Sequence, residues 1–422
     1  MTVKQPSQSS SLDDWLCYLE AIHPETIDMG LERIRQVADQ VGLLEPFSKI
    51  ILIGGTNGKG TTARCLETLL LKQGFSVGTY ASPHLIRYTE CVRVNGAELD
   101  EQYHIDAFKQ IDDQRKNISL TQFEFDTLGA LSIFKRCKVD YILLEVGLGG
   151  RNDATNIVTP IASVITTIDL DHKAFLGDTR DSVGEHKAGI FRPHTPAIVG
   201  DLDIPHSVTN YGQEVAADMV LAKREFWFTP LASQFRWQYQ DYDWYFDNPN
   251  IPAQNAATAL TVLAKLGLLP DYEVVKKCLA TIQVEGRFQK LSDNPLVYLD
   301  VAHNPESARY LATKLQELKQ KGFKIHALAA MLADKDKANV LNAVAPFVDS
   351  WSLASLYGPR GERAENLQPL LSVKSDVTLF DSVSNALEVK LSELSKGHIL
   401  IVFGSFLTVA ETMEYWQKSV QA

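Results

Sequence analysis

The sequence is poor in cysteine and has no long apolar run. Its five cysteines among 422 residues are scattered and form no C-x-x-C pair, which argues against a disulfide framework and a zinc knuckle and predicts reduced thiols. No apolar run reaches membrane-spanning length, and residues 1–11 are polar, without the apolar stretch of a signal peptide. These absences predict a soluble cytoplasmic protein with no membrane partner.

Positive charge is also scarce. The formal net charge of -11 argues against a broad nucleic-acid-binding surface, which needs a basic excess. It is compatible with a local basic site for a small anionic substrate. The length exceeds that of one ordinary domain and predicts two or three domains.

The most informative stretch lies at residues 50–62. An Ile-rich apolar run predicts a buried strand, a glycine-dense turn follows, and residues 63–71 have the pattern of an amphipathic helix. Glycines allow backbone N–H groups to face an anion, and a helix N-terminus adds positive potential. The stretch therefore predicts a phosphate-binding loop for a nucleoside triphosphate.

Two side-chain types in this loop suit the chemistry. Lys59 would contact the outer phosphates, and Thr61 or Thr62 would offer a hydroxyl to Mg²⁺. The strict G-x-x-x-x-G-K-[ST] pattern is not met, because Ile53 replaces its first Gly and Gly60 follows the lysine. A glycine-rich turn with an exposed lysine is the alternative.

The remaining pattern predicts two α/β domains, with a boundary near 285–295. We expect a P-loop-type, mostly parallel sheet domain over 1–286, with a small antiparallel subsheet near 220–247, and a smaller Rossmann-like domain over 287–422. Aromatic residues interleave with polar ones in the subsheet, which favours sheet packing over a base-stacking platform. The predicted helices are 12–22, 31–44 (with Asp28 as cap), 123–135 and 255–266, and the predicted strands are 75–80, 141–146, 162–168, 297–300, 325–331, 351–354 and 399–403, with a hairpin at 91–99.

Polar residues follow several predicted strands, where ligands collect in such sheets. Ser82 and Glu145 offer the oxygen ligands that Mg²⁺ prefers, whereas His172 taken alone suits a structural role. The G-x-G at 147–149 lacks the Gly or Ala that a dinucleotide fingerprint needs at 152, which favours a loop that a ligand approaches closely. Lys187 and Arg287 each have a second interpretation as solvated side chains.

Taken together, the motifs resemble the folylpolyglutamate synthase family, in particular the bacterial bifunctional dihydrofolate synthase/folylpolyglutamate synthases, which are cousins of the Mur ligases. The resemblance extends from Asp28 to Phe406. The segments that carry it are Gly55-Thr56-Asn57-Gly58-Lys59-Gly60-Thr61, Ser82-Pro83-His84-Leu85, Glu145-Val146-Gly147-Leu148-Gly149-Gly150, Asp153-Ala154-Thr155-Asn156, Asp171-His172, Lys187-Ala188-Gly189-Ile190, Gly286-Arg287-Phe288 and Asp300-Val301-Ala302-His303-Asn304.

The resemblance implies a monomeric, ATP-dependent amide ligase that closes around its substrates. ATP phosphorylates a carboxylate of dihydropteroate or of a reduced folate, and the amine of L-glutamate attacks the resulting acyl phosphate. Mg²⁺, in two sites, and K⁺ are the implied ions. The alternatives are a folylpolyglutamate synthase only, a Mur-type amino-acid ligase, or a nucleotide switch without ligase chemistry.

The resemblance also implies residue roles. Lys59, Lys187 (as a carbamylated lysine) and His303 are the implied catalytic residues, with His303 on the glutamate side. Ser82, Glu145 and His172 become metal ligands. Asn57, Gly58, Lys59, Gly60 and Thr61 bind ATP from the loop, and Asn255, Arg287 and Asp300 correspond to residues that hold it from the far side of the cleft. The implied pterin site comprises Ile27, Asp28, Met29, Gly30, Thr121, Gln122, Phe123, Glu124, Asn152, Asp153 and Ala154.

Overall fold

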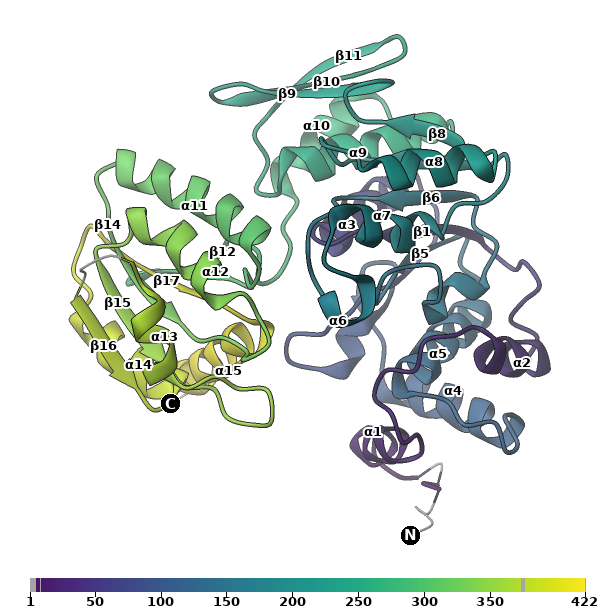
Figure 1. Cartoon of the computed structure of the whole chain (residues 1–422), viewed down its shortest axis with the longest axis horizontal. Coiled ribbons are helices and arrows are strands. Elements are labelled where there is room, and N and C mark those ends of the chain that lie inside the picture. Colours follow the sequence, from purple (N-terminus) through teal and green to yellow (C-terminus); the bar gives the residue numbers. More distant parts are fainter. Residues whose placement is uncertain (1–4, 8, 373–375, 422) are drawn as a thin grey trace. The chain divides into compact units, whose positions relative to one another are not determined.

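The computed structural model describes residues 5–7, 9–372 and 376–421, which fall into two compact units (Figure 1). The first unit runs to Ser82 and again from Tyr88 to Ile282, and the second contains Pro83–Arg87 and the chain from Gln283 onward. The chain thus changes unit a few residues before the predicted boundary. The sequence pattern gives no sign of the short excursion at Pro83–Arg87.

One large sheet organises the first unit. Its described residues form eight strands in the order β4-β3-β2-β5-β1-β6-β7-β8. From β2 to β8 along this order the strands run parallel, and β3 and β4 form an antiparallel edge. The strands are β1 (Lys49–Gly54), β2 (Val77–Tyr80), β3 (Val92–Val94), β4 (Ala97–Glu98), β5 (Tyr141–Glu145), β6 (Ala162–Ile165), β7 (Pro196–Val199) and β8 (Asp218–Leu221).

Helices flank this sheet, which explains the near-continuous apolar run of its central strand. Ile51, Leu52 and Ile53 of β1 are fully buried, as expected of a parallel strand covered on both faces. The helices are α1 (Leu12–Ala21), α2 (Glu32–Gln40), α3 (Lys59–Lys72), α4 (Glu101–Gln114), α5 (Gln122–Cys137), α6 (Lys173–Leu176), α7 (Arg180–Ala188), α8 (His206–Glu214), α9 (Ala253–Lys265) and α10 (Tyr272–Thr281).

Three local predictions and one omission can be compared with this unit. The predicted hairpin is confirmed, and its Asn95 and Gly96 both have positive φ angles (54° and 80°). The helix predicted over 31–44 ends at Gln40, and its N-cap is Leu31, so Asp28 as a cap is wrong. The strand predicted over 162–168 ends at Ile165. Helix α4 has no counterpart among the predictions.

A small antiparallel sheet packs on α9 and α10 (Figure 1). It consists of β9 (Phe226–Pro230), β10 (Gln234–Tyr239) and β11 (Tyr242–Asp247), in the order β11-β10-β9. Phe235, Trp237 and Phe246 are almost completely buried, and the Trp237 indole N–H donates to Thr261 Oγ1 of α9 over 3.0 Å. The interleaved aromatics therefore serve sheet packing, as predicted. The start of the predicted region, as β8, joins the large sheet instead.

The second unit is a smaller α/β layer structure. Its described strands follow the order β12-β13-β17-β14-β15-β16, and β12 is antiparallel to β13 while the others run parallel. One core lies under α11, α12 and α13, and another under α14 and α15. The elements are β12 (Gln289–Asp293), β13 (Leu296–Asp300), β14 (Lys324–Ala329), β15 (Ser350–Ala354), β16 (Asp376–Phe380), β17 (His398–Phe403), α11 (Pro305–Gln320), α12 (Lys337–Val344), α13 (Ala364–Leu367), α14 (Val383–Glu393) and α15 (Phe406–Gln421).

The predicted fold class, a mostly parallel α/β domain with a small antiparallel subsheet and a smaller second α/β domain, is confirmed. Within the described part of the chain, none of the helices combines the length and the apolar character needed to span a bilayer.

Candidate active site

The predicted phosphate loop connects β1 to α3. Helix α3 begins at Lys59, earlier than the predicted start at 63, so Gly60, Thr61 and Thr62 form its first turn. Its N-cap is Gly58, which has a φ of 83°, a conformation that glycine adopts without steric cost. The first N–H groups of α3 thus form a short positive helix end. This geometry suits a phosphate group.

Lys59 folds back onto its own loop. Its ammonium donates to the carbonyl oxygens of Gly55 (3.1 Å) and Thr56 (3.3 Å), and Nζ lies 3.8 Å from Oε1 of Glu145. Glu145 is the last residue of β5 and is buried. The loop lysine and the strand-end carboxylate therefore meet as predicted, with opposite charges at the carboxyl edge of the sheet.

Asn255 holds the loop from α9. Its Nδ2 donates to the carbonyl oxygen of Gly58 over 3.0 Å, and the side chain is buried. A Cβ on Gly58 would lie 2.1 Å from this nitrogen, so the close contact requires glycine. Asn255 belongs to the same unit as the loop, and its expected place on the far side of the cleft is wrong.

Three residues were predicted as metal ligands. Glu145 ends β5, and Ser82 follows β2, whose Tyr80 pairs with Leu144 of β5, so both belong to the carboxyl edge of neighbouring strands. His172 is the N-cap of α6 and has a left-handed conformation with φ of 49°. Its side chain is 42% exposed, and its Nε2 lies 3.9 Å from the Asp171 carboxylate.

These donors fit Mg²⁺ in one respect. The described residues contain no group of three His, Cys, Asp or Glu side chains spaced to hold a metal ion. Mg²⁺ usually takes one or two carboxylates and completes its shell with water and substrate phosphates. The single buried carboxylate of Glu145 beside the phosphate loop is consistent with this mode of Mg²⁺ binding.

Lys187 lies in the last turn of α7 and is buried. The loop that follows β5 meets this turn, because the Arg151 N–H donates to the carbonyl oxygen of His186 over 2.8 Å. A Cβ on Gly150 would lie 3.1 Å from the Lys187 carbonyl oxygen. The glycines of this loop thus allow close packing against α7. This agrees with the rejection of a dinucleotide fingerprint.

The predicted pterin segments come together around Arg33, which the sequence pattern does not reveal. Its guanidinium bonds the Asp28 carboxylate (2.6 Å), the Asp28 carbonyl oxygen (2.9 Å) and Glu124 (3.2 Å). Glu124 forms a capping box with Thr121 at the start of α5. Burial raises the pKa of Glu124, and bonds from Thr121 and the charge of Arg33 oppose the rise.

The third segment joins this group through the loop after β5. Met29 Cε lies 3.9 Å from the position that a Cβ on Gly149 would occupy. The Phe123 ring lies 2.4 Å from the position that a Cβ on Gly147 would occupy. Asp153 accepts from Leu148 N at 2.7 Å, and burial raises the pKa of its carboxyl. The other members of the set are Ile27 (43% exposed), Gly30 and Gln122 (half-buried), Asn152 (exposed) and Ala154 (buried).

Asp126 is a further acidic residue that the sequence pattern does not single out. It lies on α5 one turn after Phe123, and the Tyr88 hydroxyl donates to its Oδ1 over 2.7 Å. Burial raises the pKa of the Asp126 carboxyl to about 7. A single acidic residue on a helix gives no sequence signal for this burial.

The second unit holds the other predicted residues at the end of β13. Asp300 accepts from Phe288 N and Ala302 N, both at 2.8 Å, and burial raises its pKa to about 6 against the opposing charge of Arg287. The Phe406 ring contacts both the Arg287 guanidinium (5.7 Å) and the His303 ring (6.0 Å). Arg287 and His303 thus share one aromatic neighbour.

Comparisons with known proteins agree on one family. The model described as Mur ligase middle domain matches residues 53–219, and the one described as Mur ligase, glutamate ligase domain matches residues 286–406. The dihydrofolate synthase/folylpolyglutamate synthase of Escherichia coli (strain K12) is 44% identical over 419 residues, which are 98% of this chain and 98% of that protein.

Solved structures give the same result. Escherichia coli FolC in complex with DHPP and ADP has a TM-score of 0.95 and 42% identity, over 99% of this chain and 100% of that one. A bifunctional folylpolyglutamate synthase/dihydrofolate synthase with Mn, AMPPNP and L-glutamate bound has a TM-score of 0.91 and 44% identity, over 98% of this chain and 100% of that one.

Proposed function

Because the chain belongs to the dihydrofolate synthase/folylpolyglutamate synthase family of Mur-type ligases, we propose that it is a bifunctional ATP-dependent amide ligase. It adds L-glutamate to dihydropteroate, forming dihydrofolate, and to tetrahydrofolates, forming folylpolyglutamates. The observation that carries this proposal is the phosphate loop, in which Lys59 lies 3.8 Å from the strand-end carboxylate of Glu145. The family relation supplies the substrates.

The reaction has two steps. A carboxylate oxygen of the pteroate or folate attacks the γ-phosphorus of ATP, and ADP leaves. The amine of L-glutamate then attacks the acyl carbon and loses a proton, and inorganic phosphate leaves with the former carboxylate oxygen. Lys59 and the N–H groups of α3 hold and neutralise the transferring phosphoryl group, which is largely an electrostatic and positioning task.

The other predicted residues divide the remaining tasks. Ser82, Glu145 and His172 would hold Mg²⁺, and Lys187, once carbamylated, would supply a carboxylate for a second ion. Bound Mg²⁺ neutralises charge on the phosphates. Arg287 and Asp300 bind ATP, and His303 binds the glutamate. The segments Ile27–Gly30, Thr121–Glu124 and Asn152–Ala154 bind the pterin.

The proposal extends to compartment and assembly. All five cysteines are described, and each is a free thiol, which supports a reducing compartment such as the cytoplasm. One chain carries every motif of the predicted site, which supports a monomer.

An isotope experiment tests the acyl-phosphate route. Dihydropteroate labelled with ¹⁸O in its carboxylate is incubated with ATP, Mg²⁺, L-glutamate and the protein. We expect one ¹⁸O atom in the released phosphate. ADP release without glutamate dependence would contradict the ligase and favour a nucleotide switch, and unlabelled phosphate alongside product would contradict the acyl phosphate.

A further inference from the structure

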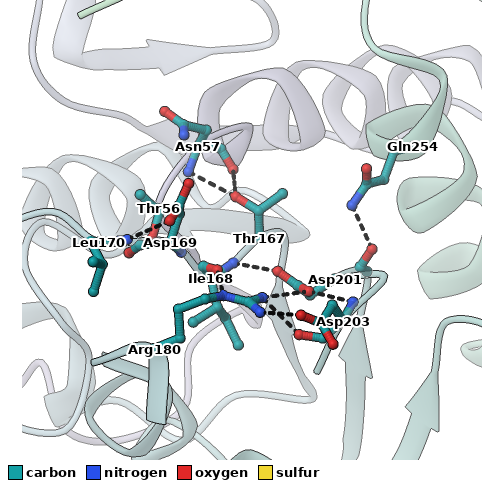
Figure 2. A network of polar contacts seen from close by, with 11 residues as sticks. Thr56, Asn57, Thr167, Ile168, Asp169, Leu170, Arg180, Asp201, Asp203 and Gln254 are labelled. Atoms are coloured by element: carbon teal, nitrogen blue, oxygen red, sulfur yellow. Dashed lines mark hydrogen bonds and ion pairs between the residues drawn. The ribbon is translucent and has the colours of Figure 1, made fainter. Parts of the chain in front are cut away.

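The segment after β6 is bonded to the phosphate loop along its length (Figure 2). Thr167 accepts from Asn57 N at its hydroxyl (3.1 Å) and from Thr56 N at its carbonyl oxygen (2.8 Å). The Asp169 N–H donates to the Thr56 hydroxyl, and the Thr56 hydroxyl donates to the Asp169 carbonyl oxygen, each over 3.0 Å. The conformation of this segment therefore sets that of Thr56 and Asn57.

Ile168 lies between these two contacts, and two side chains hold its backbone from the other side. Asp201 Oδ2 accepts from Ile168 N over 2.6 Å, and Arg180 Nε donates to the Ile168 carbonyl oxygen over 2.9 Å. Arg180 Nη2 also donates to Asp201 Oδ1 at 3.1 Å. Arg180 and Asp201, which we call the Ile168 clamp, thus satisfy both backbone groups of one residue and each other (Figure 2).

The Ile168 clamp is itself well anchored. Asp201 is 6% exposed and accepts a third bond from Asp203 N at 2.8 Å. Arg180 donates to the Asp203 carbonyl oxygen over 2.7 Å and is the first residue of α7. Asp201 is buried and Arg180 is 34% exposed, and charged groups that bond at this many points hold their geometry firmly.

We propose that Arg180 and Asp201 are positioning residues for nucleotide binding, which fix Thr167 and Asp169 and through them the phosphate loop. Neither side chain contacts the loop itself in any bond described above, so each acts through Ile168. The inference rests on the proposed function, since it assumes that this loop binds the phosphates of ATP. Displacing groups that orient a site typically costs about 10–100-fold in affinity or activity.

The test measures ADP binding by calorimetry in EDTA, together with hydrogen exchange at the Thr56 and Asn57 amides. For Asp201→Ala we expect about tenfold weaker ADP binding and faster exchange at both amides. Arg180→Ala is the milder second variant, because the arginine side chain is 34% exposed, and we expect changes in the same direction. The double variant should have about the same ADP affinity as the single variant with the lower affinity, because the pair acts as a unit.

Asp112→Ala is the matched control. Asp112 is a buried carboxylate of the same unit that accepts from Arg115 Nε over 2.6 Å, and it lies on α4, which packs against α1 and α5. We expect it to lower the melting temperature with unchanged ADP affinity and unchanged exchange at Thr56 and Asn57. Equal losses of affinity in Asp112→Ala and Asp201→Ala would overturn the inference, as would Ile168-clamp variants that bind ADP and exchange like the unaltered chain. Absence of ADP binding by the unaltered chain would instead overturn the proposed function.

Discussion

Lys187 is a basic side chain in a buried setting. It is 4% exposed in the last turn of α7, and an ammonium in such a place is costly unless it is compensated. Carbamylation, in which the deprotonated amine adds CO₂ and releases a proton, would turn the cation into a carboxylate, which suits a second Mg²⁺ site. The proposed role of Lys187 therefore depends on its carbamylation.

We predict that Lys187→Ala loses most activity, on the order of 100-fold, and needs more Mg²⁺ for half-maximal rate. A magnesium titration of glutamate-dependent ADP release measures both. Lys72→Ala is the control, since Lys72 is an exposed lysine in the last turn of α3 and its loss should change neither quantity. Unchanged activity of Lys187→Ala would remove Lys187 from the site.

Asp126 gives a prediction for pH dependence. Its carboxyl has a pKa of about 7 in the folded chain, against an ordinary value of 3.8, because it is buried. The folded state therefore binds this proton more tightly, so the residue's contribution to the free energy of unfolding falls as pH rises from about 4 and is fully lost above about 7.

Asp126→Asn removes that dependence and keeps an oxygen acceptor for Tyr88. At pH 8 we expect the variant to be more stable than the unaltered chain by about 2 kcal/mol. This is less than the full pKa shift implies, because the residue as a whole, unlike its carboxyl group, is only half-buried and solvent screens part of the charge. At pH 4 the two should melt alike. Thermal melting at both pH values measures this, and a variant that is less stable at both would refute the pKa assignment.

At the scale of elements, the junction of β1, the phosphate loop and α3 depends on one close contact. Gly58 has a φ of 83°, and a Cβ there would lie 2.1 Å from Asn255 Nδ2. We predict that Gly58→Ala lowers stability by about 1–2 kcal/mol and weakens ADP binding. Adding Asn255→Ala should recover part of the stability, because it removes the clash but leaves the backbone strain. No recovery in melting experiments would mean that the contact is unimportant.

The small antiparallel sheet gives an element-scale test of packing. Trp237 is fully buried against α9, whereas Trp227 of β9 is 44% exposed. We predict a loss of about 3–5 kcal/mol for Trp237→Ala and a change within about 0.5 kcal/mol for Trp227→Ala. Denaturant unfolding followed by fluorescence measures both. Similar losses would contradict the assignment of the two faces.

Elements differ in how far sequence could predict them. The phosphate loop is local, so Gly-rich spelling and flanking periodicity were sufficient to predict it. The start of α3 was placed too late because Gly60 and two threonines weaken the helical signal, and β6 was placed too long because Thr166, Thr167 and Ile168 favour strands. The Thr167 carbonyl oxygen instead accepts from the phosphate loop, and the Ile168 backbone bonds the Ile168 clamp. Such tertiary contacts leave no local pattern in the sequence.

The candidate site shows the same limit. Lys59 and Glu145 could be predicted because one lies in a Gly-rich loop and the other ends a buried strand, and Asn57 followed from the resemblance. Arg33, Asp126, Arg180 and Asp201 were missed because their partners are distant in sequence; Arg33, for example, bonds Glu124 across 91 positions. Single polar residues on helices and loops give no sign of such partners.

At the scale of the whole molecule, the two units carry different parts of the predicted chemistry. The first has the phosphate loop, the metal-ligand candidates and the pterin segments, and the second has Arg287, Asp300 and His303. Nearly all residues of the Mur ligase middle-domain match (residues 53–219) lie in the first unit, and the glutamate ligase domain match (residues 286–406) lies in the second. A functional test therefore needs both units.

The most direct test of the central claim is ATP-dependent incorporation of labelled L-glutamate, with dihydropteroate and tetrahydrofolate as acceptors in parallel reactions. The account predicts incorporation into both, each lost on omission of ATP or Mg²⁺. Incorporation with tetrahydrofolate alone would leave a folylpolyglutamate synthase and contradict the pterin-site assignment. Incorporation with neither acceptor, by protein that binds ADP, would contradict the proposed function.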